Sequence, residues 1–540
     1  MEEGYHITVL QDSKRITVKC MDGEKLLEAM LRHGIRHRFD CGGRGTCGKC
    51  KVQVVAGELS ESREDIRILD EAERSSGYRL ACKACPQGDI TIKLPAYGEE
   101  KMMVLTEGQE GSAPSQKETG RSGCYIGIDL GTTTLAAHLV EGSSGEILAV
   151  SSMVNPQRVY GVDIISRMKA SLEGKGDDLK KLIRDGLRAL ILQVRQGAPP
   201  GVKGIEQIAI AGNTTMIHLL MGYSCEGLGI YPFTPVTTMP ITSSFHELFA
   251  EDHLPGPGGF SAGELEKELL EELDEVPVSI LPGISAFVGG DVLAGLGVCG
   301  FDCSEEVCLL IDLGTNGELA IGNKEKLYVS STAAGPAFEG GNISIGAGSV
   351  PGAINRVRLG DTIPGIITIG GRKPVGICGT GVVELCSELL RTGGMDETGL
   401  LCEEYFQNGY PLYRDSQVRL VFTQKDVREL QLAKAAIRAG LELLLRNYGV
   451  SWEQVKRVYL AGGFGFELDI SMAVHIGLLP EELEDRIVTV GNSSLTGAVK
   501  YAADPEFSGR LMAIRKHACE IHLSNEEDFQ ELYIGNINFS

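Results

Sequence analysis

With 540 residues, 43% of them hydrophobic and 23% charged, the chain is too long for one core, so we expect three or more compact units. Its net charge of −22 argues against a nucleic-acid-binding surface and favours partners with a basic docking face. The sequence contains no apolar run of membrane-helix length and no secretory signal, so we expect a cytoplasmic protein whose fifteen cysteines are metal ligands or reduced core thiols.

The first hundred residues predict a small mixed domain. Residues 5–20 alternate apolar and polar side chains around a turn at 12–13, which predicts a β-hairpin. The further elements that we expect, in chain order, are an amphipathic helix over 24–34, a strand over 49–59, a helix over 63–76 and a strand at the end of the segment 78–95.

A glycine-rich loop lies between the first helix and the next strand. Its sequence over residues 40–50, DCGGRGTCGKC, contains three cysteines, and 31 residues separate the last of them from Cys82. Four thiolates in this pattern suit a 2Fe–2S cluster, because the glycines let backbone N–H groups approach the sulfides without a Cβ clash. A zinc site remains an alternative, with Cys82 and Cys85 as its second pair.

The stretch CGGRGTCGKC…YRLACK resembles the 2Fe–2S ferredoxins of β-grasp topology, and the resemblance covers residues 1–98. It implies four cluster ligands, which are Cys41, Cys47, Cys50 and Cys82. Cys85 and Cys20 match no ligand position, so we expect both to be bystanders. Residues 99–123 are rich in Gly, Ser, Glu and Gln, a composition that predicts a flexible linker.

A second pattern occurs twice in the remaining sequence. CYIGIDLGTTTLAAHLV begins at Cys124 and VCLLIDLGTNGELAIG at Val307, so Asp129 and Asp312 hold matching positions 183 residues apart. Each copy predicts a buried strand, a tight turn and a second strand. One such turn alone is usually an ordinary hairpin. Two facing turns, with their backbone N–H groups and hydroxyls, would bind a polyphosphate from both sides.

The repeat therefore predicts a nucleotide site. The turns supply the expected phosphate-binding residues, which are Gly131, Thr132, Thr133, Gly314, Thr315 and Asn316. Asp129 and Asp312 are the candidate catalytic residues, because carboxylates there would hold Mg²⁺ or orient the attacking water. Gly462 and Gly463 follow a third buried strand and would let the backbone approach adenosine. The small residues of VGNSSLTGAVKYAA suit close helix packing between the two halves.

The order of these motifs resembles the fold shared by sugar kinases, heat-shock chaperones and actin. A ferredoxin domain ahead of such an ATPase resembles the reductive activators of corrinoid proteins, as do NPQRVYGVDIISRM and GPAFEGGNISIGAGSVPGAI. The resemblance implies an α+β β-grasp ferredoxin domain followed by an α/β two-lobed actin-like ATPase domain over residues 124–540. The first lobe would cover about 124–303 and the second about 304–540.

The same resemblance implies an ATP-hydrolysing enzyme that passes an electron from its 2Fe–2S cluster to the Co(II) corrinoid of a partner protein. The product, Co(I), serves methyl transfer. The implied cofactors are the cluster, ATP and Mg²⁺, the implied electron donor is a ferredoxin or flavodoxin, and a homodimer through the ATPase domain fits the family. The chain has no DxHxxG loop, so we expect the corrinoid on the partner. The alternatives are an activator of another low-potential enzyme, a small-molecule kinase with a ferredoxin appendage, or a redox-sensing ATP-binding protein.

Ordinary structural roles explain most of the other candidates. Cys299, Cys303 and Cys308 have no common cluster spacing, so we expect structural roles for them, with Cys308 as a core thiol on a strand. Cys378 lies in GICGTGVVE, for which we expect a strand-to-helix turn near the nucleotide; the alternative is a 4Fe–4S site at a dimer interface, as in the activators of 2-hydroxyacyl-CoA dehydratases. His218 lies in an apolar helical segment, which predicts a buried histidine with its hydrogen bonds satisfied. Glu318 and Glu339 stay candidates for positioning water.

Overall fold

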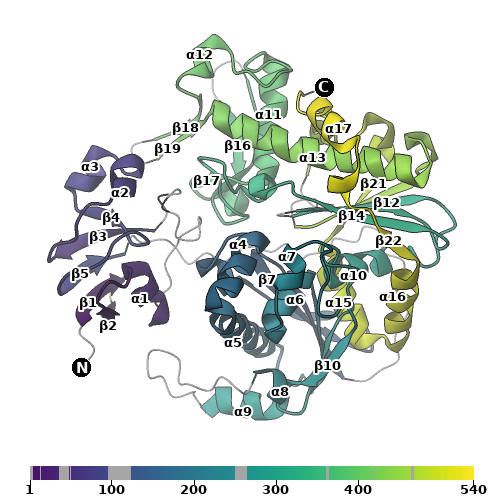
Figure 1. Ribbon diagram of the computed structural model, residues 1–540, viewed down its shortest axis with the longest axis horizontal. Helices are drawn as coiled ribbons and strands as arrows, with labels where there is room; N and C mark the ends of the chain where they lie inside the picture. Colours follow the sequence, from purple (N-terminus) through teal and green to yellow (C-terminus); the bar gives the residue numbers. More distant parts are fainter. Residues whose placement is uncertain are drawn as a thin grey trace. The chain divides into compact units, whose positions relative to one another are not determined.

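The computed structural model (Figure 1) describes residues 4–11, 14–33, 35, 45, 48, 50–94, 123–202, 204–249, 264–314, 316–360, 364–415, 418–463 and 468–539. The chain divides into two compact units, so the expectation of three or more is wrong. The first unit comprises Met1–Glu100, Asn155–Gly186 and Phe249–Glu271, and the second comprises Lys101–Val154, Leu187–Leu248 and Glu272–Ser540. The length of the chain overestimates the number of compact units, because one hydrophobic cluster contains buried residues from both halves of the second unit.

The N-terminal part of the first unit is a five-stranded sheet in the order β2-β1-β5-β3-β4. The hairpin β1–β2 is antiparallel and β5 runs parallel to β1, which is the β-grasp arrangement. The elements are β1 (Gly4–Gln11), β2 (Lys14–Met21), α1 (Leu26–Arg32), β3 (Lys51–Ala56), α2 (Arg63–Ile68), α3 (Glu71–Ser75), β4 (Tyr78–Leu80) and β5 (Ile90–Lys93). The predicted hairpin and first helix are confirmed, while Asp12, Ser13 and Gly34 lie outside the described residues.

The single helix predicted over 63–76 is two short helices, α2 and α3. Leu69 is extended, and Asp70 begins the second helix as its N-cap, accepting a hydrogen bond from the backbone N–H of Glu73. An aspartate that binds the backbone in this way favours a helix start over a helix interior. The remaining elements of this unit are η1 (Pro156–Val159), α4 (Ile164–Ala170), η2 (Ser171–Lys175), the first part of α5 (Gly176–Gln196) and most of α9 (Glu264–Leu273).

The second unit contains two six-stranded sheets with the same internal plan. In each sheet, three consecutive strands form an antiparallel meander. Two further strands lie on the side of the first meander strand and run parallel to it. The first sheet comprises β6 (Cys124–Leu130), β7 (Thr134–Glu141), β8 (Ile147–Val154), β9 (Ile205–Gly212), β10 (Ile241–Ser244) and β11 (Pro277–Ile280). The second comprises β12 (Cys308–Leu313), β13 (Gly317–Gly322), β14 (Leu327–Thr332), β20 (Arg457–Ala461), β21 (Ile487–Gly491) and β22 (Ala518–Glu520). The repeat seen in the sequence is therefore a repeat of structure.

Two helices join the halves of the second unit. They are α10 (Gly290–Val298), which follows β11, and α15 (Ser493–Ala503), which follows β21. A Cβ atom added at Gly497 would lie 2.5 Å from the Cβ of Ala294, and one added at Gly127 would lie 2.5 Å from the backbone N of Val499. Helix α15 thus packs directly on α10 and on β6 of the other half, as its small residues predict.

The rest of the second unit surrounds these sheets. The long helix α13 (Gln424–Tyr448), N-capped by Thr423, packs on β13 and β14 and is visible across the upper part of Figure 1. The other elements are α6 (Thr214–Met221), α7 (Glu226–Gly229), α8 (Phe245–Phe249), η3 (Pro336–Glu339), β15 (Ala353–Arg358), β16 (Gly365–Thr368), η4 (Ile369–Gly371), β17 (Gly376–Ile377), α11 (Gly379–Thr392), α12 (Glu403–Phe406), β18 (Tyr410–Arg414), β19 (Arg419–Phe422), η5 (Trp452–Gln454), α14 (Ile470–His475), η7 (Glu481–Arg486), α16 (Pro505–His517), η8 (Leu523–Asn525) and α17 (Phe529–Gly535). Among the residues that the structure describes, no helix has the length and apolar character needed to cross a membrane.

The close crossing of α10 and α15 gives a test of this architecture. Gly497→Val should lower the thermal unfolding temperature strongly, since overpacking a well-packed contact costs about 1–3 kcal/mol. The matched control is Gly509→Ala in α16, where an added Cβ meets nothing within 4 Å. That control should be neutral or slightly stabilising, because alanine is the better helix former. Equal unfolding temperatures for the two variants would contradict the packing.

Candidate functional site

The structure brings two of the predicted cluster ligands together. Cys50 precedes β3 and Cys82 follows β4, and the pairing of Lys51 with Leu80 places these strand ends side by side. The two Sγ atoms lie 3.2 Å apart, both side chains are buried, and the residues form no disulfide. Sulfurs on one tetrahedral metal with bonds of about 2.3 Å stand roughly 3.8 Å apart, so this pair fits a shared iron. Cys41 and Cys47 lie outside the described residues.

Two glycines of the predicted loop have a definite conformational role. Gly45 and Gly48 have φ values of +74° and +69°, which favour glycine. A Cβ added at Gly45 would lie 2.6 Å from Cε of Lys83, and one added at Gly48 would lie 2.9 Å from Cγ2 of Ile68. At both described positions the backbone thus needs glycine and lies against side chains of the same domain.

A buried aspartate connects this loop region to the fourth ligand. Asp65 accepts hydrogen bonds from the backbone N–H of Leu80 at 2.7 Å and from the N–H and hydroxyl of Ser62 at 2.7 and 2.8 Å. Asp65 thereby fixes α2 to the end of β4, two residues before Cys82. Arg67 in the same helix donates to the carbonyl oxygen of Gly45 at 3.3 Å. This helix was expected, but its role in positioning the ligands was not.

The two DLGT turns have related geometry. In the first, the N–H of Gly131 donates to the carbonyl of Thr134 at 3.1 Å, and in the second the N–H of Gly314 donates to the carbonyl of Asn316 at 3.0 Å. A Cβ added at Gly131 would lie 2.6 Å from that carbonyl oxygen of Thr134, so the first turn needs glycine. Thr315 lies outside the described residues.

The carboxylate of Asp129 is held by side chains from the other half. Asn492 donates from Nδ2 to Oδ2 at 2.9 Å, and Ser494 donates from Oγ to Oδ1 at 2.7 Å. Both donors stand at the start of α15, where Asn492 is also the N-cap. Burial raises the pKa of Asp129, while the hydrogen bonds from Ser494 and Asn492 oppose that rise. Sequence analysis singled out Asp129 but not its two partners.

Three further carboxylates lie near Asp129. Asp312 stands opposite Glu318 across the β12–β13 pair, and Asp291 is the second residue of α10. Burial raises the pKa of Asp312 to about 7, with added repulsion from Asp291 and then Asp129. Burial likewise raises the pKa of Asp291 to about 7 and that of Glu318 well above its usual range. All four residues keep part of their surface exposed.

This carboxylate group limits how Mg²⁺ would bind. Among the described residues, no three His, Cys, Asp or Glu side chains come close enough together to hold one metal ion. Mg²⁺ commonly binds to one or two carboxylates, several waters and the phosphates of its substrate. Asp129 and Asp312 fit that pattern as ligands, directly or through water, of a cation that arrives with ATP.

The predicted threonines and glycines each contact a defined neighbour. Thr132 accepts a hydrogen bond from Asn213 at 3.0 Å, and Thr133 donates to Oε2 of Glu339 at 3.0 Å, across the two halves. Gly462 has φ +92°, and a Cβ there would lie 2.8 Å from Oδ1 of Asp312. The positive φ and the carbonyl oxygen of Leu313, which would lie 2.6 Å from that Cβ, also require glycine at 462. A Cβ at Gly463 would meet nothing within 4 Å.

The candidates assigned to ordinary structure are confirmed in those roles where the structure describes them. His218 is buried, with Nδ1 2.7 Å from the carbonyl of Thr214 and Nε2 accepting from the N–H of Val236 at 3.0 Å. Cys378 is buried and donates to the carbonyl of Ile354. Cys308 is a buried strand thiol, as expected, whereas Cys299 is half-buried and Cys303 is exposed.

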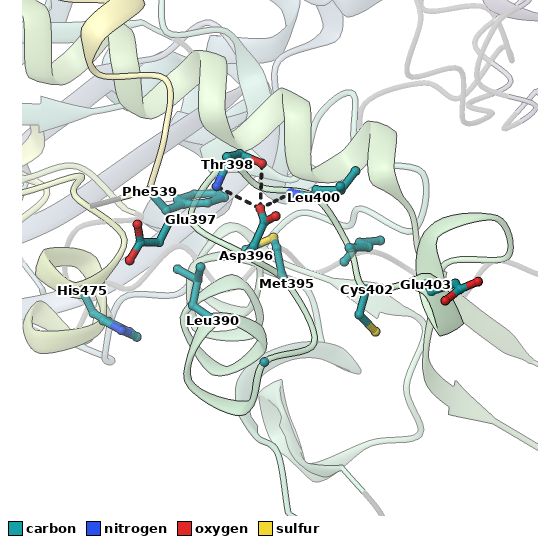
Figure 2. A pocket seen from close by; sticks show the side chains of 12 residues that line it. Leu390, Met395, Asp396, Glu397, Thr398, Leu400, Cys402, Glu403, His475 and Phe539 are labelled. Carbon is teal, nitrogen blue, oxygen red and sulfur yellow. Dashed lines mark hydrogen bonds between the residues drawn. The ribbon is translucent and has the colours of Figure 1, made fainter.

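A pocket of about 770 Å³ lies elsewhere in the second unit, between the end of α11 and the start of α12 (Figure 2). Its lining includes Asp396, whose Oδ1 accepts from the N–H and hydroxyl of Thr398 and the N–H of Leu400. Those bonds hold the loop and lower the pKa of Asp396. None of the predicted site residues lines this pocket.

Comparison with known proteins identifies the domains that carry these residues. The chain matches three family models: a 2Fe–2S iron–sulfur cluster binding domain over residues 9–87, the RACo middle region over 124–257 and the C-terminal ASKHA domain of RACo over 306–540. It is 30% identical to the corrinoid activation enzyme RamQ of Eubacterium limosum, over 94% of each chain. The chain belongs to the family of reductive activators of corrinoid proteins.

Two further relatives cover most of the chain. This corrinoid activator is 25% identical to a [Co(II) methylated amine-specific corrinoid protein] reductase of Methanosarcina barkeri, over 77% of this chain and 76% of that one. The solved structure of a reductive activator for corrinoid, iron–sulfur protein aligns over 99% of this chain and 98% of its own, with a TM-score of 0.67 and 27% identity. The β-grasp ferredoxin domain and the actin-like ATPase domain expected from the sequence are thus confirmed.

The cluster assignment is tested by two cysteines that are three positions apart. Cys82→Ser should abolish the visible 2Fe–2S absorbance and most of the bound iron, because the fourth thiolate is lost. The matched control, Cys85→Ser, should keep both, since the thiol of Cys85 is exposed. Loss of the chromophore in Cys85→Ser, with retention in Cys82→Ser, would place the fourth ligand at 85.

The buried carboxylates predict a pH-dependent stability. Between pH 3.8 and about 7, Asp312 keeps its proton in the folded protein and loses it in the unfolded chain. Its contribution to the free energy of unfolding is therefore fully present below pH 3.8 and is lost as the pH rises to about 7. Asp312→Asn should unfold at a higher temperature than the wild type by at least about 2 °C at pH 8, and the gap should shrink toward pH 4.5. A gap that is the same at both pH values would contradict the raised pKa.

Proposed function

We propose that this chain uses ATP to deliver one electron from its 2Fe–2S cluster to the Co(II) corrinoid of a partner protein. Family membership supports the reaction, and one structural observation supports its coupling. That observation is the pair of hydrogen bonds by which Asn492 and Ser494 of one half hold Asp129 of the other. Because groups of both halves meet at Asp129, a nucleotide bound there would interact with both halves. ATP can therefore favour one arrangement of the two halves over another.

We assign the cluster to four thiolates, Cys41, Cys47, Cys50 and Cys82. The buried, closely spaced thiols of Cys50 and Cys82 support this set. When bound, the cluster supplies a one-electron carrier. Asp65 and the glycines at 45 and 48 would keep the loop and the β4 end in the geometry that the ligands need.

We assign the ATP site to the two turns and their neighbours. The turn residues Gly131, Thr132, Thr133, Gly314, Thr315 and Asn316 would bind the phosphates, and Gly462 and Gly463 would face the nucleoside. Asp129 and Asp312 would hold Mg²⁺ or its water ligands. The backbone hydrogen bonds that close both turns at the ends of β6 and β12 support this assignment, because they fix the position of the turns. Those bonds use the N–H groups of Gly131 and Gly314, so hydroxyls and other backbone groups of the turns would contact the phosphates.

ATP is needed because Co(I) lies at a very low potential. Each 59 mV of an uphill one-electron transfer costs about 1.4 kcal/mol, so an ordinary donor cannot complete the step alone. A ferredoxin or flavodoxin would supply the electron. We further propose a ferredoxin domain over 1–98, a tether over 99–123, lobes over about 124–303 and 304–540, and a homodimer formed through the ATPase domain. The fifteen cysteines support a cytoplasmic location, where thiols stay reduced.

The test mixes the reduced protein anaerobically with a Co(II) corrinoid protein from a methyltransferase system and follows the cobalt absorption. Co(I) should appear with MgATP and not with MgADP or without nucleotide. The control omits the activator, which separates its effect from direct chemical reduction. If ATP is hydrolysed while several corrinoid partners stay Co(II), the electron acceptor is another low-potential enzyme and the proposal fails.

A further inference from the structure

The segment that carries three of the proposed cluster ligands differs in charge from the rest of the chain. Residues 36–51 contain five Lys or Arg side chains and a single carboxylate, that of Asp40. This segment therefore has a net charge of +4 in a chain of −22, which leaves −26 for the other residues. The overall charge favours basic partners, but a local excess of the opposite sign favours an acidic one.

Two further cations lie beside this segment in the described part of the domain. Arg67, which is exposed on α2, donates a hydrogen bond to the carbonyl oxygen of Gly45 at 3.3 Å. Lys83 follows Cys82 directly, and its Cε would lie 2.6 Å from a Cβ added at Gly45. Glu64 also approaches, with its Cγ 2.9 Å from the same Cβ position. These three side chains together add a net charge of +1 next to the ligand segment.

These two cations are not neutralised by neighbours. Within the described ranges of the chain, no carboxylate forms an ion pair with either of them. Other cations of the domain differ in this respect, because Lys51 pairs with Glu73, and Arg79 pairs with Glu61 at 3.3 Å. The acidic side chains around α2 and α3 are thus partly used within the domain, while the positive charge beside Gly45 stays available to a partner.

An exposed apolar side chain stands next to this charge. Ile66 precedes Arg67 in α2, and 58% of its surface is exposed. Its other neighbour, Asp65, is buried and accepts a hydrogen bond from the backbone N–H of Leu80, which fixes the helix and leaves Ile66 facing outward. Protein–protein contacts combine apolar anchors with a charged rim that guides the encounter. We call Ile66, Arg67 and Lys83 the docking surface.

We propose that the docking surface binds an acidic electron-carrier protein, which reduces the cluster. This inference rests on the proposed electron-transfer function. Charge decides the occupant, because a positive surface on an otherwise acidic chain repels basic proteins less strongly screened elsewhere and attracts acidic ones. The carrier is oxidised by one electron, the cluster receives that electron, and no bond forms or breaks. Since Lys83 is the neighbour of Cys82 in the sequence, a carrier bound there lies close to a proposed ligand.

The test follows reduction of the cluster by a reduced bacterial flavodoxin, an acidic one-electron carrier, in stopped flow. For the wild type, the second-order rate constant should fall about tenfold between roughly 0.02 and 0.3 M salt, because salt screens the attraction. Arg67→Glu and Lys83→Glu should each lower the low-salt rate constant about fivefold or more and flatten its salt dependence. The control is Arg15→Glu, which reverses an exposed cation on β2, the sheet edge opposite β4, and should behave as the wild type.

Two further measurements separate docking from damage to the cluster. The methyl viologen radical is a cationic reductant, so it should reduce every variant at least as fast as the wild type. Calorimetric titration with oxidised flavodoxin involves no electron transfer, and its Kd should rise about fivefold or more in Arg67→Glu and Lys83→Glu. If Arg67→Glu fails to keep the 2Fe–2S absorbance, Lys83→Glu and the salt dependence of the wild type still decide the matter.

Three results would overturn the inference. They are reduction of the wild type by flavodoxin at a rate that salt does not change, a rate that rises with salt, and wild-type rate and affinity in Lys83→Glu. A rate that rises with salt would show that repulsion by the acidic remainder of the chain dominates. In each case formation of Co(I) with MgATP by the wild type would leave the proposed function intact. Absence of Co(I), with salt-dependent reduction by flavodoxin, would instead remove the proposed acceptor and keep the docking surface.

Discussion

The nucleotide site depends on one contact, the carboxylate of Asp129 held between Asn492 and Ser494. Asp129 is the penultimate residue of β6 in the first half, and its two donors stand at the start of α15 in the second half. That helix lies against β6 and α10 so closely that Gly127 and Gly497 admit no side chain. The site is therefore continuous with the packing that joins the halves, and a ligand that engages Asp129 acts on that packing directly.

The iron–sulfur site likewise depends on contacts between segments that are separated in the sequence. Its two described candidate ligands come from the ends of two paired strands, and the register of β3 with β4 brings their sulfurs together. Asp65 holds one of those strand ends by a backbone hydrogen bond. In both sites an aspartate accepts hydrogen bonds from groups that other parts of the sequence supply. Such contacts are costly to break, because they would leave a desolvated carboxylate without its donors.

Local sequence predicted the fold and part of each site. The repeated DLGT motif located both turns, both aspartates and the two-lobed plan, since its signal lies within a few residues. Asn492 and Ser494 were missed because their importance arises from three-dimensional pairing between halves. A comparison of the two helix starts, GGD at 289–291 and NSS at 492–494, would have pointed to them. The break between α2 and α3 was also missed. The sequence was interpreted as one helix over 63–76, but the side chain of Asp70 favours the N-cap of a second helix over a helix interior.

An electron carrier and an ATPase share one chain here because reduction of Co(II) requires added free energy at the moment of transfer. Our central claim is that the site built around Asp129 couples the free energy of ATP to the reduction of Co(II). The most direct measurement is the rate of Co(I) formation with MgATP by Asp129→Asn, with the 2Fe–2S absorbance recorded on the same sample. We predict an unchanged cluster spectrum and no Co(I) above the level without nucleotide. Wild-type Co(I) formation by this variant would contradict the claim.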